Sequence, residues 1–369
     1  RHAVETIARR ARISELDVAR TAVQLAAAHP GDAIEAHVGY YLVDDGVGQT
    51  LAALQAHTGG RPVRIPPRKV PLAAYLVLIA IVVALATTGL MGQAGARGAG
   101  WAPPWLLALL AVLVFSELGI ALTNWLATII VPPRPLPRMD FSHGVPAASR
   151  TLVVVPCMFA DAASVDALAE GLEVRFLANR DPNLHYALLG DYLDADQETL
   201  PGDAATLAHA TARIEELNRR YAGDSPRGGE RFFLFHRPRT WNAREGRWIG
   251  AERKRGKLAA LNALLRGGGA GAFERVVGRI EVLANVRYVI TLDSDTRLPR
   301  DAARELVATL AHPLNRAVFD PAQQRVTRGY GILQPSVGSS FSGRRFSRYA
   351  RLFGAEPGID PYTRMVSDV

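Results

Sequence analysis

The chain has 369 residues, of which 49% are hydrophobic and 21% are charged, and a formal net charge of +8. This length allows two or more structural units, and the composition indicates a soluble unit and a membrane segment in one chain. The single cysteine, Cys157, excludes an internal disulfide and a cysteine-based zinc cluster, and its place in an apolar run predicts a buried thiol. Neither a helix-turn-helix spacing nor a basic stripe with interleaved aromatic residues is present, so we expect no nucleic acid partner.

Residues 1–60 carry apolar side chains at near-helical spacing, with arginine and glutamate between them. This pattern predicts a helical segment, which we place in the cytoplasm. Residues 61–69 form a basic, proline-rich linker. Because the sequence starts without an initiator methionine and stops without a helix cap, we interpret it as a piece of a longer protein.

Two apolar segments follow the linker. Residues 70–92 contain no charged side chain, and residues 103–131 contain one, Glu117. Each segment is long enough to cross a hydrocarbon core of about 30 Å at about 1.5 Å per residue. Lysine and arginine cluster on the outer flanks of the pair, at Arg61, Arg64, Arg68, Lys69, Arg134 and Arg138. The positive-inside rule therefore predicts a hairpin through the bacterial inner membrane, with the lipid bilayer as partner and residues 93–102 in the periplasm.

Three polar side chains of the second apolar segment, Glu117, Asn124 and Thr128, share one helical face. Lipid cannot satisfy these groups, so we expect the face to contact other helices. The alternative is that it lines a path for a saccharide.

Residues 149–369, which follow a second linker at 132–148, alternate between apolar strands and helices. Strands are predicted at 151–155, 185–189, 232–236 and 286–292. Helices are predicted at 164–179, 206–221, 257–266 and 298–310. This βαβ spacing predicts an α/β domain with a doubly wound, Rossmann-like parallel sheet.

Ligands of such sheets bind at the carboxyl ends of the strands. The predicted strand at 286–292 leads directly into Asp293 and Asp295, whose carboxylates suit a hard divalent cation. The alternative is that this pair caps the helix that follows. Asp191 comes after another predicted strand and is either a ligand-binding acid or a simple loop acid.

A basic segment, 252–257, precedes an apolar helix and contains Gly256, which permits close approach of another backbone. Basic side chains at a helix N-terminus suit an anionic diphosphate. A solvated helix start explains the same pattern equally well.

Four motifs together resemble bacterial cyclic β-1,2-glucan synthases: WIGAERKRGKL at 248–258, TLDSDT at 291–296, GILQP at 331–335 and PGIDPY at 357–362. The transferase region of that family is a family 84 glycosyltransferase, related to processive synthases of the cellulose type. The resemblance extends upstream to HVGYYL at 37–42 and to the two apolar segments, so it covers nearly the whole chain.

The resemblance implies an inverting enzyme of the A-type glycosyltransferase fold, truncated here at its C-terminus. Such enzymes take UDP-glucose with Mg²⁺ or Mn²⁺, extend a β-1,2-glucan acceptor and close it into a ring. Asp293 and Asp295 match the donor and metal motif, Asp191 matches an acid that contacts the nucleotide, and Lys257 matches a basic donor-binding position. The catalytic general base is expected beyond Val369, so we expect a donor half-site that is inactive by itself.

Two other functions remain open on the sequence. One is the synthesis of a different polysaccharide, of the cellulose or hyaluronan type, on the same fold. The other is a membrane scaffold that keeps a degenerate transferase fold without catalysis.

Overall fold

The computed structural model describes residues 2–32, 34–58, 72–96, 98, 103–130, 136–224 and 229–335. The chain divides into two compact units, one of residues 1–137 together with 332–369 and the other of residues 138–331. The predicted linker at 61–69, the PGIDPY motif at 357–362 and the end of the predicted transferase domain lie outside the described residues.

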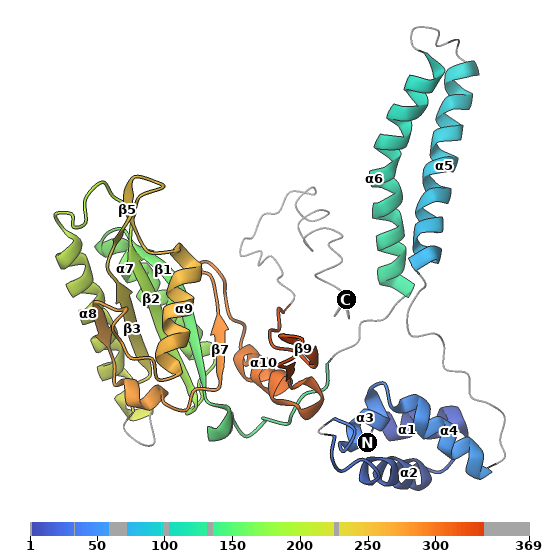
Figure 1. Ribbon diagram of the computed structural model, residues 1–369, viewed down its shortest axis with the longest axis horizontal. Coiled ribbons are helices and arrows are strands. Elements are labelled where there is room, and N and C mark those ends of the chain that lie inside the picture. Colours follow the sequence, from blue (N-terminus) through green and yellow to red (C-terminus); the bar gives the residue numbers. More distant parts are fainter. Residues whose placement is uncertain are drawn as a thin grey trace. The chain divides into compact units, whose positions relative to one another are not determined.

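A small helical bundle opens the first unit (Figure 1). Its helices are α1 (His2–Ala11), α2 (Glu15–Ala27), α3 (Val38–Val43) and α4 (Val47–Thr58). Ser14 begins α2 as an N-cap residue, since its side chain accepts a hydrogen bond from the Asp17 backbone N–H. Val18 and Tyr41 are fully buried among the four helices, so the segment has an apolar core of its own.

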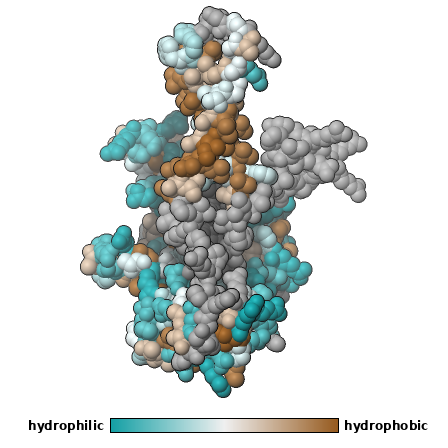
Figure 2. Space-filling model, turned by 90° about the vertical axis from the view of Figure 1, so that its right-hand side faces the viewer, coloured by the Kyte–Doolittle hydropathy of each residue, from teal (hydrophilic) through white to brown (hydrophobic). Residues whose placement is uncertain are grey.

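Two long helices, α5 (Leu72–Ala96) and α6 (Pro104–Ile130), form the predicted apolar hairpin. Both are long and apolar enough to cross a membrane. Figure 2 shows their side chains as a brown, apolar surface, and α5 buries none of its residues. Helix α5 extends to Ala96, past the predicted end of the first segment at residue 92, because the sequence up to Ala96 contains no proline or charge that would end it.

Asn124 of α6 faces α5, where it accepts a hydrogen bond of 2.7 Å from the Tyr75 hydroxyl. Gly119 allows the two helices to approach closely, since a Cβ there would lie 2.9 Å from Cγ2 of Val83. Glu117 is exposed on the hairpin. The side chain of Thr128 lies outside the described part of the chain.

The second unit is a three-layer α/β structure around a five-stranded sheet with the order β6-β3-β2-β1-β7 (Figure 1). Its strands are β1 (Thr151–Phe159), β2 (Leu184–Tyr192), β3 (Phe232–Arg237), β6 (Arg275–Val277) and β7 (Tyr288–Thr291). Strands β1, β2, β3 and β7 are parallel, and β6 pairs antiparallel with β3. The α/β class with a parallel sheet, predicted from the strand and helix spacing, is therefore confirmed.

Both faces of this sheet are covered, which explains why its strands are apolar without alternation. One face packs against α7 (Ala162–Ala178), α8 (Asp203–Arg220) and α10 (Ala302–Ala311), and the other against α9 (Arg253–Leu265). Short 3-10 helices lie at Ala147–Ser149, Ala222–Asp224, Ile280–Leu283 and Pro313–Asn315.

Two short hairpins and the strand β6 were not predicted. The hairpins are β4 (Thr240–Asn242) with β5 (Arg247–Ile249), and β8 (Val318–Asp320) with β9 (Arg325–Arg328). Each strand has three or four residues, too few to show a period in the sequence. The helix predicted to begin at residue 298 begins at Ala302, because Pro299 and the left-handed Asp301 (φ 61°) precede it.

Candidate functional site

The predicted site residues Asp191 and Asp293 lie at the carboxyl edge of the parallel sheet, and Lys257 reaches this edge from α9. Asp191 is the eighth residue of β2, and Asp293 follows β7 by two residues. The Nζ atom of Lys257 lies 3.0 Å from Oδ2 of Asp191 and donates a 2.7 Å hydrogen bond to the Cys157 carbonyl of β1. Three elements that are distant in sequence therefore converge here.

Asp191 is held by two cations. Arg237, at the end of β3, donates from Nε to Oδ1 and from Nη2 to Oδ2, each at 2.9 Å. Asp191, Arg237 and Lys257 are all buried, and a bidentate pair of this kind fixes the geometry of both side chains. One carboxylate between two cations leaves a net positive charge under the edge of the sheet. Asp191 therefore lies in a strand and not in a loop, and its carboxylate is paired with Arg237 and Lys257.

Two glycines allow close contacts at this cluster and in the turn that precedes α9. A Cβ at Gly250 would lie 2.4 Å from Oδ2 of Asp191, and a Cβ at Gly256 would lie 2.0 Å from the Ala251 carbonyl oxygen. Gly256 therefore does allow a close backbone approach, but the backbone that approaches is that of the turn before α9. This turn is tight, since Glu252 and Arg253 both have positive φ, at 51° and 48°.

The carboxylates of Asp293 and Asp295 lie on an exposed loop after β7. Lys254, in the first turn of α9, forms an ion pair with Asp293 Oδ1. The following helix has Asp301 at its N-cap position, so neither Asp293 nor Asp295 caps it. The helix-capping alternative for this pair is wrong.

Arg175 of α7 supports this loop by hydrogen bonds to its backbone. Its Nη2 donates to the carbonyl oxygens of Asp293 (3.2 Å), Ser294 (2.8 Å) and Thr296 (2.7 Å), and its Nε donates to Thr296 at 3.1 Å. The guanidinium has room because residue 171, one turn earlier, is glycine: a Cβ there would lie 2.9 Å from Nη1. Burial lowers the pKa of Arg175, and the charge of Asp295 opposes that shift.

Asp293 and Asp295 fit a hard divalent cation by donor chemistry, since Mg²⁺ is usually held by one or two carboxylates with substrate phosphates and water. Their exposure leaves room for the other ligands. Within the described residues, no group of three or more histidine, cysteine, aspartate or glutamate side chains is placed to hold a metal. The pair could therefore contribute only part of a coordination shell.

A buried aromatic cluster supports the opposite face of the sheet at the same edge. The His236 ring stacks on Phe159 at 5.5 Å between centroids and meets Tyr192 edge-on at 4.2 Å. Gly190 lies beneath this stack, because a Cβ there would come within 2.7 Å of the Phe159 ring. Burial lowers the pKa of His236 to about 4 and raises the pKa of Tyr192 to about 12. These groups are packing residues and stay uncharged near neutral pH.

Reasoning from the sequence missed Arg175, Arg237 and the pairing of Lys254 with Asp293. Arg237 could have been noticed as a charge at the end of the apolar strand β3. Arg175 has no such signal, since it is one of several charged residues along α7. Asp161, at another strand end, proves to be the N-cap of α7. Cys157 is buried, as predicted, and burial raises the pKa of its thiol to about 12.

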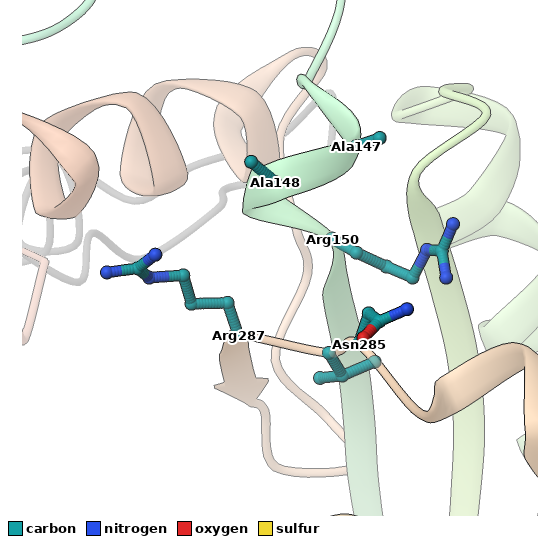
Figure 3. Close-up of a pocket in the computed structure, with 6 residues that line it drawn as sticks. Ala147, Ala148, Arg150, Asn285 and Arg287 are labelled. Atoms are coloured by element: carbon teal, nitrogen blue, oxygen red, sulfur yellow. The ribbon is translucent and has the colours of Figure 1, made fainter.

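Two surface hollows of the second unit lie away from this edge. One of about 700 Å³ is formed at the amino ends of β1 and β7, with Arg150 and Arg287 among its lining residues (Figure 3). Another of about 570 Å³ lies between α8 and β6. Ligands of parallel sheets bind at the carboxyl ends of strands, so neither hollow competes with the cluster around Asp191 and Asp293.

No protein-family model matches the chain. Over 388 aligned residues it is 39% identical to the cyclic beta-(1,2)-glucan synthase NdvB of Rhizobium meliloti (strain 1021). The chain resembles a glucan synthase along its whole length. The alignment includes 100% of the chain but 13% of the relative, so most of that protein has no counterpart here. The resemblance inferred from the four motifs is confirmed.

Proposed function

We propose that this chain is the donor-binding part of a membrane-bound glycosyltransferase that acts in glucan synthesis. The observation that carries the proposal is the convergence of Asp293, Asp295, Lys254 and Lys257 at the carboxyl edge of the sheet. Identity of 39% to a glucan synthase over the whole chain supports the same class of reaction.

The donor that we propose is UDP-glucose, bound by Asp191, Lys257 and Asp293. A diphosphate needs fixed positive charge, and the buried cluster supplies one net positive charge beside the exposed ammonium of Lys254. Asp191 would act by holding Lys257 and Arg237 in place, because both of its carboxylate oxygens already contact these cations.

The cofactor that we propose is Mg²⁺ or Mn²⁺, with Asp295 and Asp293 as its ligands. Such a cation neutralises a diphosphate leaving group as its bond to the sugar breaks. Lys254 would exchange its partner from Asp293 to the donor phosphates, which keeps the charges at this loop balanced.

The reaction that we propose is inverting transfer of glucose to a β-1,2-glucan acceptor that is later closed into a ring. We assign the general base to none of the described residues. We also propose that α5 and α6 cross the inner membrane, with the α/β unit in the cytoplasm, where nucleotide sugars are made.

Titration of the 369-residue chain with UDP-glucose, with and without Mn²⁺, tests the donor site. We expect Mn²⁺-dependent binding in the wild type and roughly tenfold or greater weakening in Asp295→Asn, since a hard cation loses a charged ligand. Glu170→Gln, on the exposed surface of α7, is the control and should bind like the wild type. Equal binding by Asp295→Asn would contradict the metal site, and no binding by the wild type would contradict the donor site.

A further inference from the structure

The hairpin at residues 240–249 carries two tryptophans beside the candidate site. Trp241 of β4 and Trp248 of β5 are cross-strand partners, with ring centroids 5.9 Å apart. Trp241 is 54% exposed, which is unusual for a side chain that gains much from burial. We call residues 240–249 the tryptophan hairpin.

The tryptophan hairpin is fixed to the second unit. Trp248 exchanges two backbone hydrogen bonds with Ala195, of 2.8 and 2.9 Å, in the loop after β2. Ile249 is buried, and the next residue, Gly250, packs directly against Asp191. The rings are thus held on a rigid support rather than on a free loop.

The tryptophan hairpin also lies close to the proposed donor site. An extended strand advances about 3.3 Å per residue, which places the Cα atom of Trp248 within about 7 Å of that of Gly250, at the Asp191 cluster. Figure 1 shows β5 beyond the end of the central sheet where β1 and β2 finish and α9 starts. A molecule on the tryptophans would therefore be a neighbour of a donor at Asp191 and Lys257.

The charges around the rings are balanced. The tryptophan hairpin itself carries Arg244, Glu245 and Arg247. Asp196 pairs with Arg247, and Arg253 pairs with both Glu245 and Asp194, so this connected group contains three arginines and three carboxylates. An anionic lipid surface or a nucleic acid would call for an excess of positive charge. The exposed ring of Trp241 among balanced charged side chains suits an uncharged, hydroxyl-rich partner.

We propose that the tryptophan hairpin binds the glucan acceptor, with a sugar ring packed on the exposed face of Trp241. The C–H groups on one face of a glucopyranose can cover an aromatic ring, while its hydroxyls reach the polar side chains around it. This inference rests on the proposed function, since it takes the acceptor to be a β-glucan.

Binding of short linear β-1,2-glucan oligosaccharides to the 369-residue chain tests the proposal, by calorimetry and by tryptophan fluorescence. Trp241→Ala should weaken glucan binding roughly tenfold, as expected for loss of a central aromatic contact. Its binding of UDP-glucose with Mn²⁺ should stay as in the wild type. Trp241→Phe keeps an aromatic ring and should retain most of the glucan affinity, while circular dichroism verifies the fold of both variants.

Phe319→Ala is the matched control, because Phe319 is an exposed aromatic residue, at 53%, on the other hairpin of the same unit. It should bind glucan like the wild type. The proposal would be overturned if the wild type binds no glucan, or if Trp241→Ala binds glucan with wild-type affinity. It would also be overturned if Trp241→Ala loses binding to phosphatidylglycerol vesicles but keeps binding to glucan. If glucan binding depends on Trp241 but no UDP-glucose binds, the proposed function fails while the glucan surface stands.

Discussion

Arg175 connects the interior of the second unit to the most exposed part of the candidate site. Its side chain ends in hydrogen bonds to three carbonyl oxygens of the loop that carries Asp293 and Asp295. The two neighbouring carboxylates of this loop repel each other, and the positive charge of the buried Arg175 guanidinium beneath the loop offsets part of that repulsion. Arg175 is therefore a positioning residue for the carboxylates that we propose as metal ligands.

Arg175→Met should unfold more readily than the wild type, by about 2–3 kcal/mol, because three partly buried carbonyl oxygens lose a charged hydrogen-bond donor. It should also weaken Mn²⁺-dependent UDP-glucose binding more than it weakens the binding of UDP without metal. Thermal denaturation and titration measure the two effects. Arg219→Met, at an exposed site on α8, is the control, and a variant Arg175→Met with wild-type metal dependence would exclude the positioning role.

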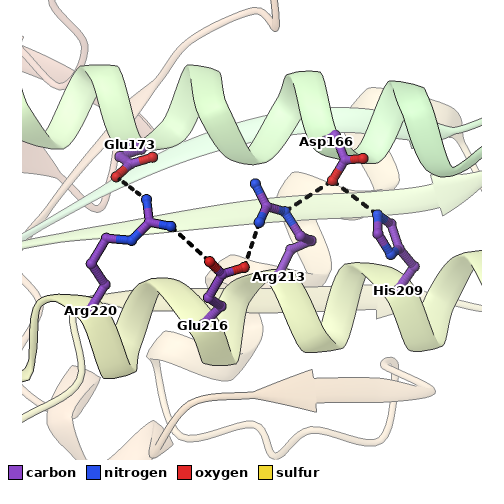
Figure 4. Close-up of polar contacts among 6 residues, drawn as sticks. All are labelled: Asp166, Glu173, His209, Arg213, Glu216 and Arg220. Atoms are coloured by element: carbon purple, nitrogen blue, oxygen red, sulfur yellow. Dashed lines mark hydrogen bonds and ion pairs between the residues drawn. The ribbon is translucent and has the colours of Figure 1, made fainter.

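At the scale of elements, α7 and α8 are joined along their outer sides by a row of ion pairs (Figure 4). Asp166 and Glu173 of α7 contact His209, Arg213 and Arg220 of α8 at 2.8 to 2.9 Å, with Glu216 between the two arginines. Exposed pairs of this kind contribute less than about 1 kcal/mol each. Their effect is on the register of the two helices, whereas the stability of this layer comes from the apolar side chains beneath them.

The buried strands β2 and β3 each carry a histidine with a lowered pKa of about 4. Burial is the main cause of the lowered pKa at both residues. At His185 the nearby Arg231 and Arg150 lower the pKa further. At His236 the charge of Asp191 opposes the shift, whereas Lys257 and Arg239 add to it. The unfolded chain binds a proton at these sites below about pH 6.5, while the folded chain does not. The stability that these two uncharged histidines contribute is therefore fully present above about pH 6.5 and is lost as the pH falls from about 6.5 toward 4.

The measurement is the melting temperature as a function of pH between about 6.5 and 4.5, above the range in which ion-paired carboxylates such as Glu173, whose pKa is lowered, take up protons. His236→Phe should show a shallower decrease than the wild type, whatever its absolute stability. His143→Gln, at an exposed position, should follow the wild-type profile. A His236→Phe profile parallel to that of the wild type would show that His236 does not carry this dependence.

At the scale of the whole molecule, the chain combines an apolar hairpin with an α/β unit that has its own complete core. Within the described residues, the outer side chains of α5 and α6 are not buried by other parts of the chain, and Leu85 and Val114 are both more than 65% exposed. Exposure of this much apolar surface in water would be costly. A lipid environment for the hairpin removes that cost.

The proposed orientation predicts opposite results for two reporter fusions. Alkaline phosphatase inserted after Gly98, between α5 and α6, should be active, because it would be in the periplasm. The same enzyme placed after Thr58, ahead of α5, should be inactive. Activity in the reverse order would place the α/β unit on the wrong side of the membrane for a nucleotide sugar and would contradict the proposed topology.

The amino-acid sequence alone determined the elements with long, regular patterns. Two uncharged stretches predicted α5 and α6, and runs such as 185–189 predicted strands of the central sheet, because burial on both faces demands continuous apolar residues. The same rule located Asp191 and Asp293, since a polar residue that ends such a run must lie at the sheet edge.

The tertiary structure alone decided which charges meet. Arg175 and Asp293 are 118 positions apart, and Asp191 lies 46 positions from Arg237, so no local pattern connects them. It also decided that Asp191 is enclosed by cations and that Asp301, and neither acid of the exposed loop, occupies the N-cap position of α10. The physical reason is that hydrophobic periodicity depends on neighbours in the chain, whereas ion pairs and loop supports depend on how packed layers bring distant segments together.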